Sequence, residues 1–147
     1  MYGDTTVMRK RAGQLREQGT DVRMLADQLM AQVDSLDWTG RAADTMRARV
    51  HDRAAQLRDA ASSHDTASES LGRHLAEVDL LKEAIDAAEH RVSSLVTDAA
   101  TQVTRLEAHQ DPDGIRRSPS DEDQALVSFV APQPGHRDWL TVTLPGH

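Results

Sequence analysis

Apolar residues recur at seven-residue intervals along most of the chain. The first row is Met8, Leu15, Val22, Leu29 and Leu36. This spacing places the row on one face of a helix and predicts a helix over residues 5–36. Asp4 stands directly before it, and Asp is a residue type that caps helix N-termini. We therefore expect the chain to begin with an amphipathic helix capped by Asp4.

A second and longer row follows. It consists of Ala43, Val50, Leu57, His64, Leu71, Val78, Ile85, Val92, Ala99 and Leu106. The row predicts a helix over about 41–109, and a seven-residue period is typical of coiled coils and helical bundles. The pattern is weakest at 62–72, where a break is an alternative. Within the row His64 is the polar member, and we interpret it as a tolerated polar residue of the seam.

Trp38-Thr39-Gly40 lies between the two predicted helices. Gly costs about 1 kcal/mol relative to Ala in a helix interior, so residues 37–40 are predicted to form a turn. The Trp38 side chain is expected to pack on both helices and pin them together. The predicted fold is all-α, an antiparallel helical hairpin over 4–110 with a long second helix, assembling as a bundle or coiled coil.

The two helices differ in length. At about 1.5 Å per residue the first spans roughly 50 Å and the second roughly 100 Å. Folded back from the turn, the first helix covers the second only to about Ser70, which leaves an apolar row without a partner. We expect this seam to bind a partner chain, with a homodimer as the default, unless residues 75–108 fold back as a third helix. Its members are Leu71, Val78, Leu81, Ile85, Val92, Leu95 and Leu106.

The C-terminal tail, residues 111–147, has a different pattern. Asp111-Pro112 is expected to end the second helix, because Pro cannot continue its hydrogen bonds. Two short apolar runs follow at 126–130 and 139–144, and the second alternates as a strand does. They predict a β-hairpin around Pro132–Gly135. An isolated hairpin is marginal in water, so docking is expected through Phe129, Trp139 and Leu140.

Composition limits the class of protein. The chain has 147 residues, a net charge of −7, no Cys and only 3% aromatic residues, which favours a narrow helical seam over a thick core. Net acidity argues against nucleic acid as a partner. No run of about 18 apolar residues could span a membrane. The N-terminus lacks the basic start and apolar stretch of a cleavable signal peptide.

Candidate chemistry is sparse. The seven His residues are scattered and form no matched ligand set for a metal. Asp111-x-Asp113-Gly114 has its Gly too early for a calcium loop and lacks the terminal Glu. Ser62 and Ser63 have no His/Asp arrangement that would make either a nucleophile. We therefore expect no catalytic residues, no metal and no cofactor.

Arginines are frequent at the start of the second helix. They are Arg41, Arg47, Arg49, Arg53 and Arg58, interleaved with Asp44, Asp52 and Asp59. One interpretation is a solvated face with local ion pairs, each contributing a few tenths of a kcal/mol. The other is a docking face for an acidic partner.

A helix of about thirty residues, then Leu36-Asp37-Trp38-Thr39-Gly40, then Arg-Ala-Ala-Asp-Thr-Met-Arg opening a longer helix resembles the Trp-X-Gly (WXG) family. These are the roughly hundred-residue helical hairpins of the type VII (ESX) secretion system. The resemblance covers about 4–106 and places Trp38 and Gly40 at the family's turn positions. The longer second helix is similar to the extended forms on actinobacterial secreted effectors.

The resemblance implies a non-enzymatic protein, either a secreted substrate or a chaperone-like partner of an effector. It implies a homodimer or a heterodimer with another WXG-like protein, contact with the secretion machinery, and export without a cleavable signal peptide. The family's Tyr-x-x-x-Asp/Glu export signal is missing after the second helix, since Tyr2 is the only Tyr. A partner would then carry the signal for the pair. The alternatives are a cytoplasmic coiled-coil scaffold or adaptor, and a toxin or enzyme acting through the tail.

Overall fold

Helix α1 spans Thr5–Asp34 in the computed structural model, which describes residues 4–109, 114 and 117–146. The Asp4 side chain accepts a hydrogen bond of 3.0 Å from the Thr6 amide, so the predicted N-cap is confirmed. The last helical residue is Asp34, and the amide of the C-cap residue Ser35 donates to the Ala31 carbonyl at 3.1 Å. This end lies two residues before the predicted one.

Helix α2 spans Arg41–Ala108 without interruption. Residues 62–72 contain no break, and residues 75–108 continue the helix instead of folding back. The physical reason is that the polar side chains of the weak stretch bond to their own helix. The Ser62 and Thr66 hydroxyls donate to carbonyls four residues earlier at 3.1 and 3.0 Å, and the His64 ring lies 2.8 Å from the Ala60 carbonyl. The expected helix stop at Asp111-Pro112 lies outside the described residues.

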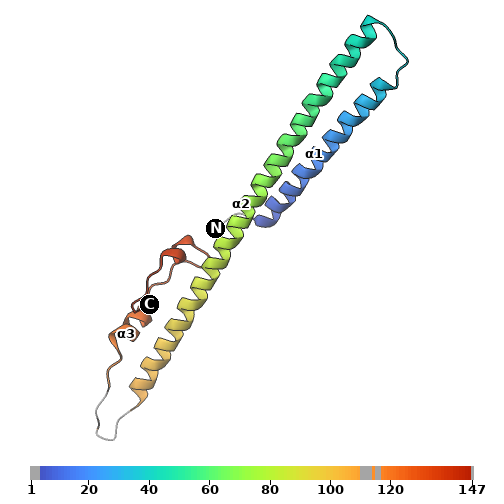
Figure 1. Ribbon diagram of the computed structural model, residues 1–147. Helices are drawn as coiled ribbons and strands as arrows, with labels where there is room; N and C mark the ends of the chain where they lie inside the picture. The colour runs from blue at the N-terminus through green and yellow to red at the C-terminus, as the bar shows by residue number, and fades with distance from the viewer. Residues whose placement is uncertain (1–3, 110–113, 115–116, 147) are drawn as a thin grey trace. The chain divides into compact units, whose positions relative to one another are not determined.

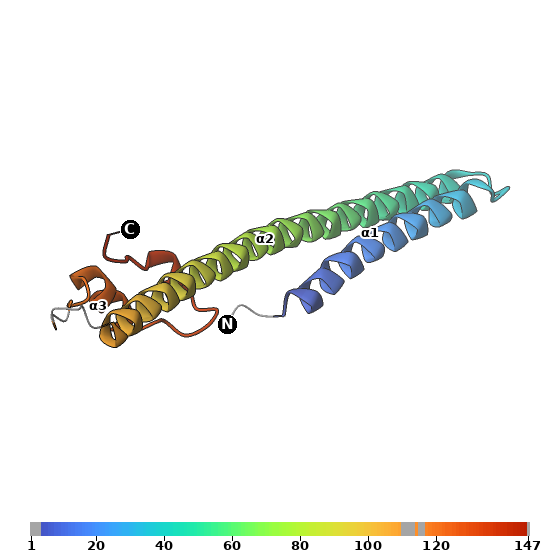
Figure 2. The same cartoon turned by 90° about the horizontal axis from the view of Figure 1, so that it is seen from below.

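The chain divides into two units, one ending at Val78 and one beginning at Asp79. In the first unit α1 runs antiparallel alongside the first part of α2 (Figures 1 and 2). The predicted antiparallel hairpin with a long second helix is therefore confirmed.

Small side chains occupy the contact between the two helices of the hairpin. Gly19 and Ala26 of α1 are buried, as are Ala54, Ala61 and Ser68 of α2. The Ser68 hydroxyl donates across the contact to the Ala12 carbonyl at 2.8 Å. A Cβ atom at Gly19 would lie only 3.1 Å from the Ala61 carbonyl oxygen, so this glycine lets the two backbones approach closely.

The predicted Leu/Val rows are not the centre of this contact. Leu15, Val22 and Leu29 of α1 and Val50 and Leu57 of α2 are only half-buried. The interface instead follows a parallel row of small residues, because helices that meet through Gly and Ala come too close together for larger side chains between them.

The tail contains helix α3, Asp121–Val127, and the 3-10 helix η1, Arg137–Thr141. No strand occurs among the described residues, so the predicted β-hairpin is wrong. The Ser120 side chain caps α3 by accepting from the Asp123 amide at 3.1 Å. The acidic first turn of α3 also suits the positive end of the helix dipole. These local signals outweigh the strand pattern.

The second unit consists of the C-terminal part of α2 and the tail, which lie side by side in Figures 1 and 2. Ile85, with 1% of its surface exposed, is the largest fully buried side chain among those described. Leu126, Trp139 and Leu144 of the tail are buried as well. The apolar row of α2 therefore has a cover within the chain, which corrects the expectation that it is bare. No helix within the described ranges is long and apolar enough to cross a membrane.

Candidate interaction site

The turn between α1 and α2 is held by hydrogen bonds to its backbone carbonyls. Gly40 has a φ of 109°, a conformation that L side chains rarely adopt, and its carbonyl accepts the Asp44 amide at 3.0 Å as α2 begins. The Arg47 guanidinium donates to the carbonyls of Leu36 and Trp38 at 3.0 and 2.5 Å. Arg47 therefore ties the turn to the first two turns of α2.

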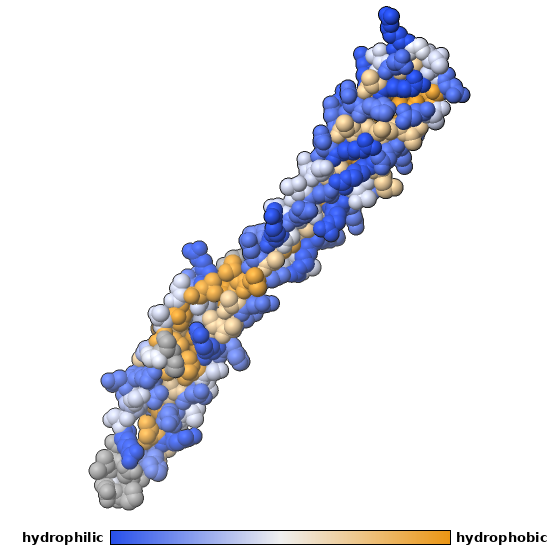
Figure 3. Space-filling view, in the orientation of Figure 1, coloured by the Kyte–Doolittle hydropathy of each residue, from blue (hydrophilic) through white to orange (hydrophobic). Residues whose placement is uncertain are grey.

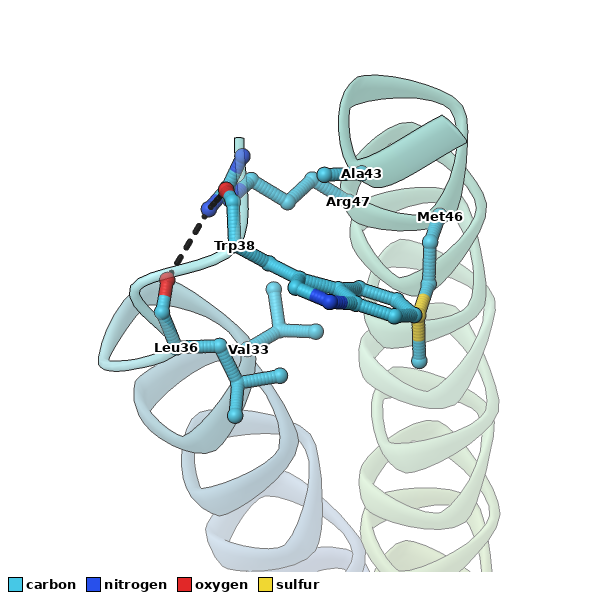
Figure 4. Close-up of a pocket in the computed structure, with 6 residues that line it drawn as sticks. All are labelled: Val33, Leu36, Trp38, Ala43, Met46 and Arg47. Atoms are coloured by element: carbon cyan, nitrogen blue, oxygen red, sulfur yellow. Dashed lines mark hydrogen bonds between the residues drawn. The ribbon is translucent and has the colours of Figure 1, made fainter. Parts of the chain in front are cut away.

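The Trp38 indole points from the turn across the end of the hairpin toward the Met46 thioether (Figure 4). With Leu36, Asp37 and Met46 it lines an open hollow of about 490 Å³. The side chain is 57% exposed, and it lies with Val33 of α1 and Ala43 and Met46 of α2 at the end of the hairpin.

Half-exposed apolar side chains continue from this hollow along the hairpin. They are Leu15, Val22 and Leu29 on α1, Leu36 in the turn, and Met46, Val50, Leu57 and Leu71 on α2. Most stand three positions after a core residue of their own helix, as Leu29 does after Ala26 and Leu57 after Ala54. The two helices are antiparallel and face each other, so side chains three positions after the core residues of either helix project to the same side of the hairpin. These residues therefore form one strip, here called the apolar strip.

The interhelical polar pairs stand at other positions relative to the buried residues of the helix contact. These buried residues, here called the core row, are Gly19, Ala26 and Val33 of α1 and Ala54, Ala61 and Ser68 of α2. Arg23 pairs closely with Asp65 and Arg58 lies 2.6 Å from Asp27, while the His51 ring forms a hydrogen bond of 3.3 Å with Asp34. These residues stand one or four positions after the core row, which places them on the side away from the apolar strip. The hairpin is thus amphipathic across its width, and the face in view in Figure 3 is mostly hydrophilic.

The arginines of early α2 take part in these polar contacts. Arg47 and Arg58 form the contacts given above, and Arg53 donates to the Gln56 side chain at 3.0 Å. Asp44 lies 3.5 Å from Arg47 within the same helix. These pairings support the interpretation of this run as a polar face with ion pairs.

The residues predicted as a partner-binding seam do not share one environment. Val78, Ile85 and Val92 are buried. Leu71, Leu95 and Leu106 are half-buried. Leu81 is 39% exposed. Within the second unit the tail therefore covers Ile85 and Val92 and leaves the apolar Leu81 exposed.

The three predicted docking residues of the tail also differ. Trp139 is buried, Phe129 is half-buried and Leu140 is exposed. Leu126 and Leu144 are buried anchors that the prediction missed. Leu126 belongs to α3, and a short helix leaves too few turns for periodicity to reveal its inner face.

One hollow of about 250 Å³ separates the tail from α2. It is lined by Arg91, Val92 and Leu95 of the helix and by Val142 and Leu144 of the tail. Nearby, the Gly135 amide donates to the Glu89 carboxylate. The hydrophobic surface seen over this unit in Figure 3 includes tail and helix together.

No group of three His, Asp or Glu side chains comes together as a metal site in the part of the chain that the structure describes. The features that stand out are instead an exposed aromatic turn and an apolar strip on a closely packed helical hairpin. Such surfaces serve association with other helices. Fold and surface thus define a helical-hairpin module with an exposed apolar side.

Comparison with known protein families assigns the chain to a family. A family model described as "Putative T7SS secretion signal domain" matches residues 1–125. The chain belongs to this family of type VII secretion signal domains, and the match includes α1, α2 and most of α3. No curated protein and no solved structure matches the chain.

Proposed function

We propose that this chain is a non-enzymatic type VII secretion substrate that is exported in association with a helical partner. The observation that carries the proposal is the apolar strip, which continues from the exposed Trp38 turn along a hairpin belonging to a secretion-signal family. A strip of this kind on an isolated hairpin is half of a bundle seam. Contact with a second hairpin would bury it.

The partner best suited to the strip is another helical hairpin of the WXG type or a helical effector segment. Seven-residue spacing on both helices matches a neighbour with the same period. We favour a heterodimer, because no Tyr-x-x-x-Asp/Glu signal follows α2 in this sequence and a partner would have to supply it. A chaperone-like role for the chain would use the same surface.

Export is tested with the full chain in a bacterium that has a functional type VII system, together with a co-expressed helical-hairpin protein of the WXG type. The chain should reach the culture filtrate in this strain and stay in the cells of an otherwise identical strain without the secretion ATPase. Equal amounts in both filtrates would contradict the proposed route.

Two variants connect export to the strip. Leu25→Asp places a charge at an exposed apolar residue one position before the buried Ala26, on the same side of α1 as the apolar strip, and Gln28→Asp places the same charge at an exposed polar residue of that helix. Leu25→Asp should lower export and abolish co-elution with the partner on gel filtration, whereas Gln28→Asp should leave both unchanged. An identical response of the two variants would contradict a role for this side of the hairpin.

A further inference from the structure

The apolar row of α2 beyond Asp79 has the spacing of a helix-binding seam but a cover that is mostly not helical. Ile85, Val92 and Ala99 follow one another at seven-residue intervals and are buried. What covers them is a seven-residue helix, a five-residue 3-10 helix and extended chain. An irregular segment does not require a seven-residue period on the surface that it covers, whereas a long partner helix does.

We propose that the tail is a displaceable cover, and that α2 from Asp79 to Ala108 is a second helix-binding surface which the tail masks. The occupant that replaces the tail is an amphipathic helix of another protein, with an apolar seven-residue row flanked by Lys or Arg. This proposal rests on the proposed function in one respect only, namely that the chain acts by helix–helix association.

Several polar groups of the tail are satisfied inside the tail, whereas the hydrogen bond from the Gly135 amide to the Glu89 carboxylate of α2 would be exchanged for water when the tail leaves. The Trp139 indole N–H donates to the Gln133 carbonyl at 2.9 Å, so the buried ring keeps its hydrogen bond when it separates from α2. Ser120 and His136 cap α3 and η1 from within the tail in the same way. Detachment therefore exposes chiefly apolar surface, which a partner helix can cover again.

The cover is also incomplete. Leu80 is 66% exposed and Leu81 is 39% exposed, although both are large apolar residues on this part of α2. A hollow remains where Val142 and Leu144 of the tail meet Val92 and Leu95. A helix with regularly spaced side chains would have apolar surface to bury here that the tail leaves open.

Charge indicates which kind of helix fits. This part of α2 carries more acidic than basic side chains, which disfavours a second copy of the same segment and favours a basic partner. The acidic residues are Asp79, Glu83, Asp86, Glu89, Asp98 and Glu107, and the basic residues are Lys82, Arg91 and Arg105.

The test uses the purified full chain and two synthetic helical peptides of about four heptads with Leu at the seam positions. One peptide carries Lys at the flanking positions and the other carries Glu. Trp139→Asp should release the tail and strengthen binding of the Lys peptide by at least about tenfold over the unchanged chain, with little binding of the Glu peptide. Val130→Asp is the matched control, since Val130 is a tail residue with 87% exposure, and it should bind as the unchanged chain does.

A second pair of samples guards against a folding defect in the Trp139 variant. Leu95→Cys with Val142→Cys, in a chain that has no other Cys, places two thiols on opposite walls of the same hollow. Joining them with a bismaleimide should prevent peptide binding, and the same variant left unjoined should bind. Equal binding with and without the cross-link, or no preference for the Lys peptide, would overturn the proposal. Neither result depends on export, so failure here is distinct from failure of the secretion role.

Discussion

Individual residues in this hairpin have roles that their residue types do not reveal. Gly13 and Gly19 both lie within α1 and look equivalent in the sequence. Gly13 has nothing within 4 Å of where a Cβ would stand, whereas a Cβ on Gly19 would come within 2.9 Å of Asp65 Oδ1 and 3.1 Å of the Ala61 carbonyl. The first glycine only weakens the helix, and the second sets the distance between the helices.

Replacing these two glycines by alanine should therefore have opposite effects. Gly13→Ala should raise the free energy of unfolding by about 1 kcal/mol, the helix-propensity difference. Gly19→Ala gains the same propensity but overpacks the contact at a cost of about 1–3 kcal/mol, so its net effect should be destabilising. Chemical denaturation followed by circular dichroism measures both, and equal stabilisation by the two variants would contradict the close contact.

Trp38 and Arg47 form a second contrast at the residue scale. Because more than half of the Trp38 side chain is exposed, Trp38→Ala should cost less than about 1 kcal/mol of stability. Arg47→Ala should cost more, since it removes donors from two turn carbonyls. Thermal unfolding of both variants ranks them. A larger loss of stability for Trp38→Ala than for Arg47→Ala would show that the indole ring, and not Arg47, holds the turn.

At the scale of elements, α2 is one helix in two environments. In the first unit it contacts α1 through the small residues Ala54, Ala61 and Ser68, and from Asp79 onward it belongs to a unit with the tail. Polar side chains at 62–66 do not break it, because they bond to carbonyls of the same helix. The tail forms short helices instead of strands because its caps are local and its helix ends are charged favourably.

A cavity created in the second unit should destabilise that unit and leave the stability of α1 unchanged. Ile85→Ala removes its largest fully buried side chain and should destabilise the unit by about 2–5 kcal/mol. Hydrogen exchange should then accelerate over 79–108 and in the tail, while residues 5–34 exchange as before. Leu80→Ala is the control, because Leu80 is largely exposed and should change little. Equal acceleration in α1 would mean that the chain opens as a single unit.

For the whole molecule, the arrangement separates two kinds of apolar surface. The apolar strip of the hairpin is open beside the Trp38 turn, whereas the C-terminal row of α2 lies under the tail. A secretion substrate with both features could bind its export partner with one surface and keep the other covered until a second helix arrives. The export and peptide-binding experiments above address the two surfaces separately.

The sequence by itself determined the hairpin, its turn, the length of both helices to within a few residues, and the kinship with type VII secretion. Seven-residue periodicity, the Asp4 cap and Trp38-Thr39-Gly40 are local signals that act within one helix or one turn. Only the tertiary structure decided which of two neighbouring rows forms the core, because periodicity is the same for both and the close approach at Gly19 selects the smaller one. It also decided that the tail covers Ile85 and Val92, since contact between segments far apart in the chain depends on shape and burial that no local pattern records.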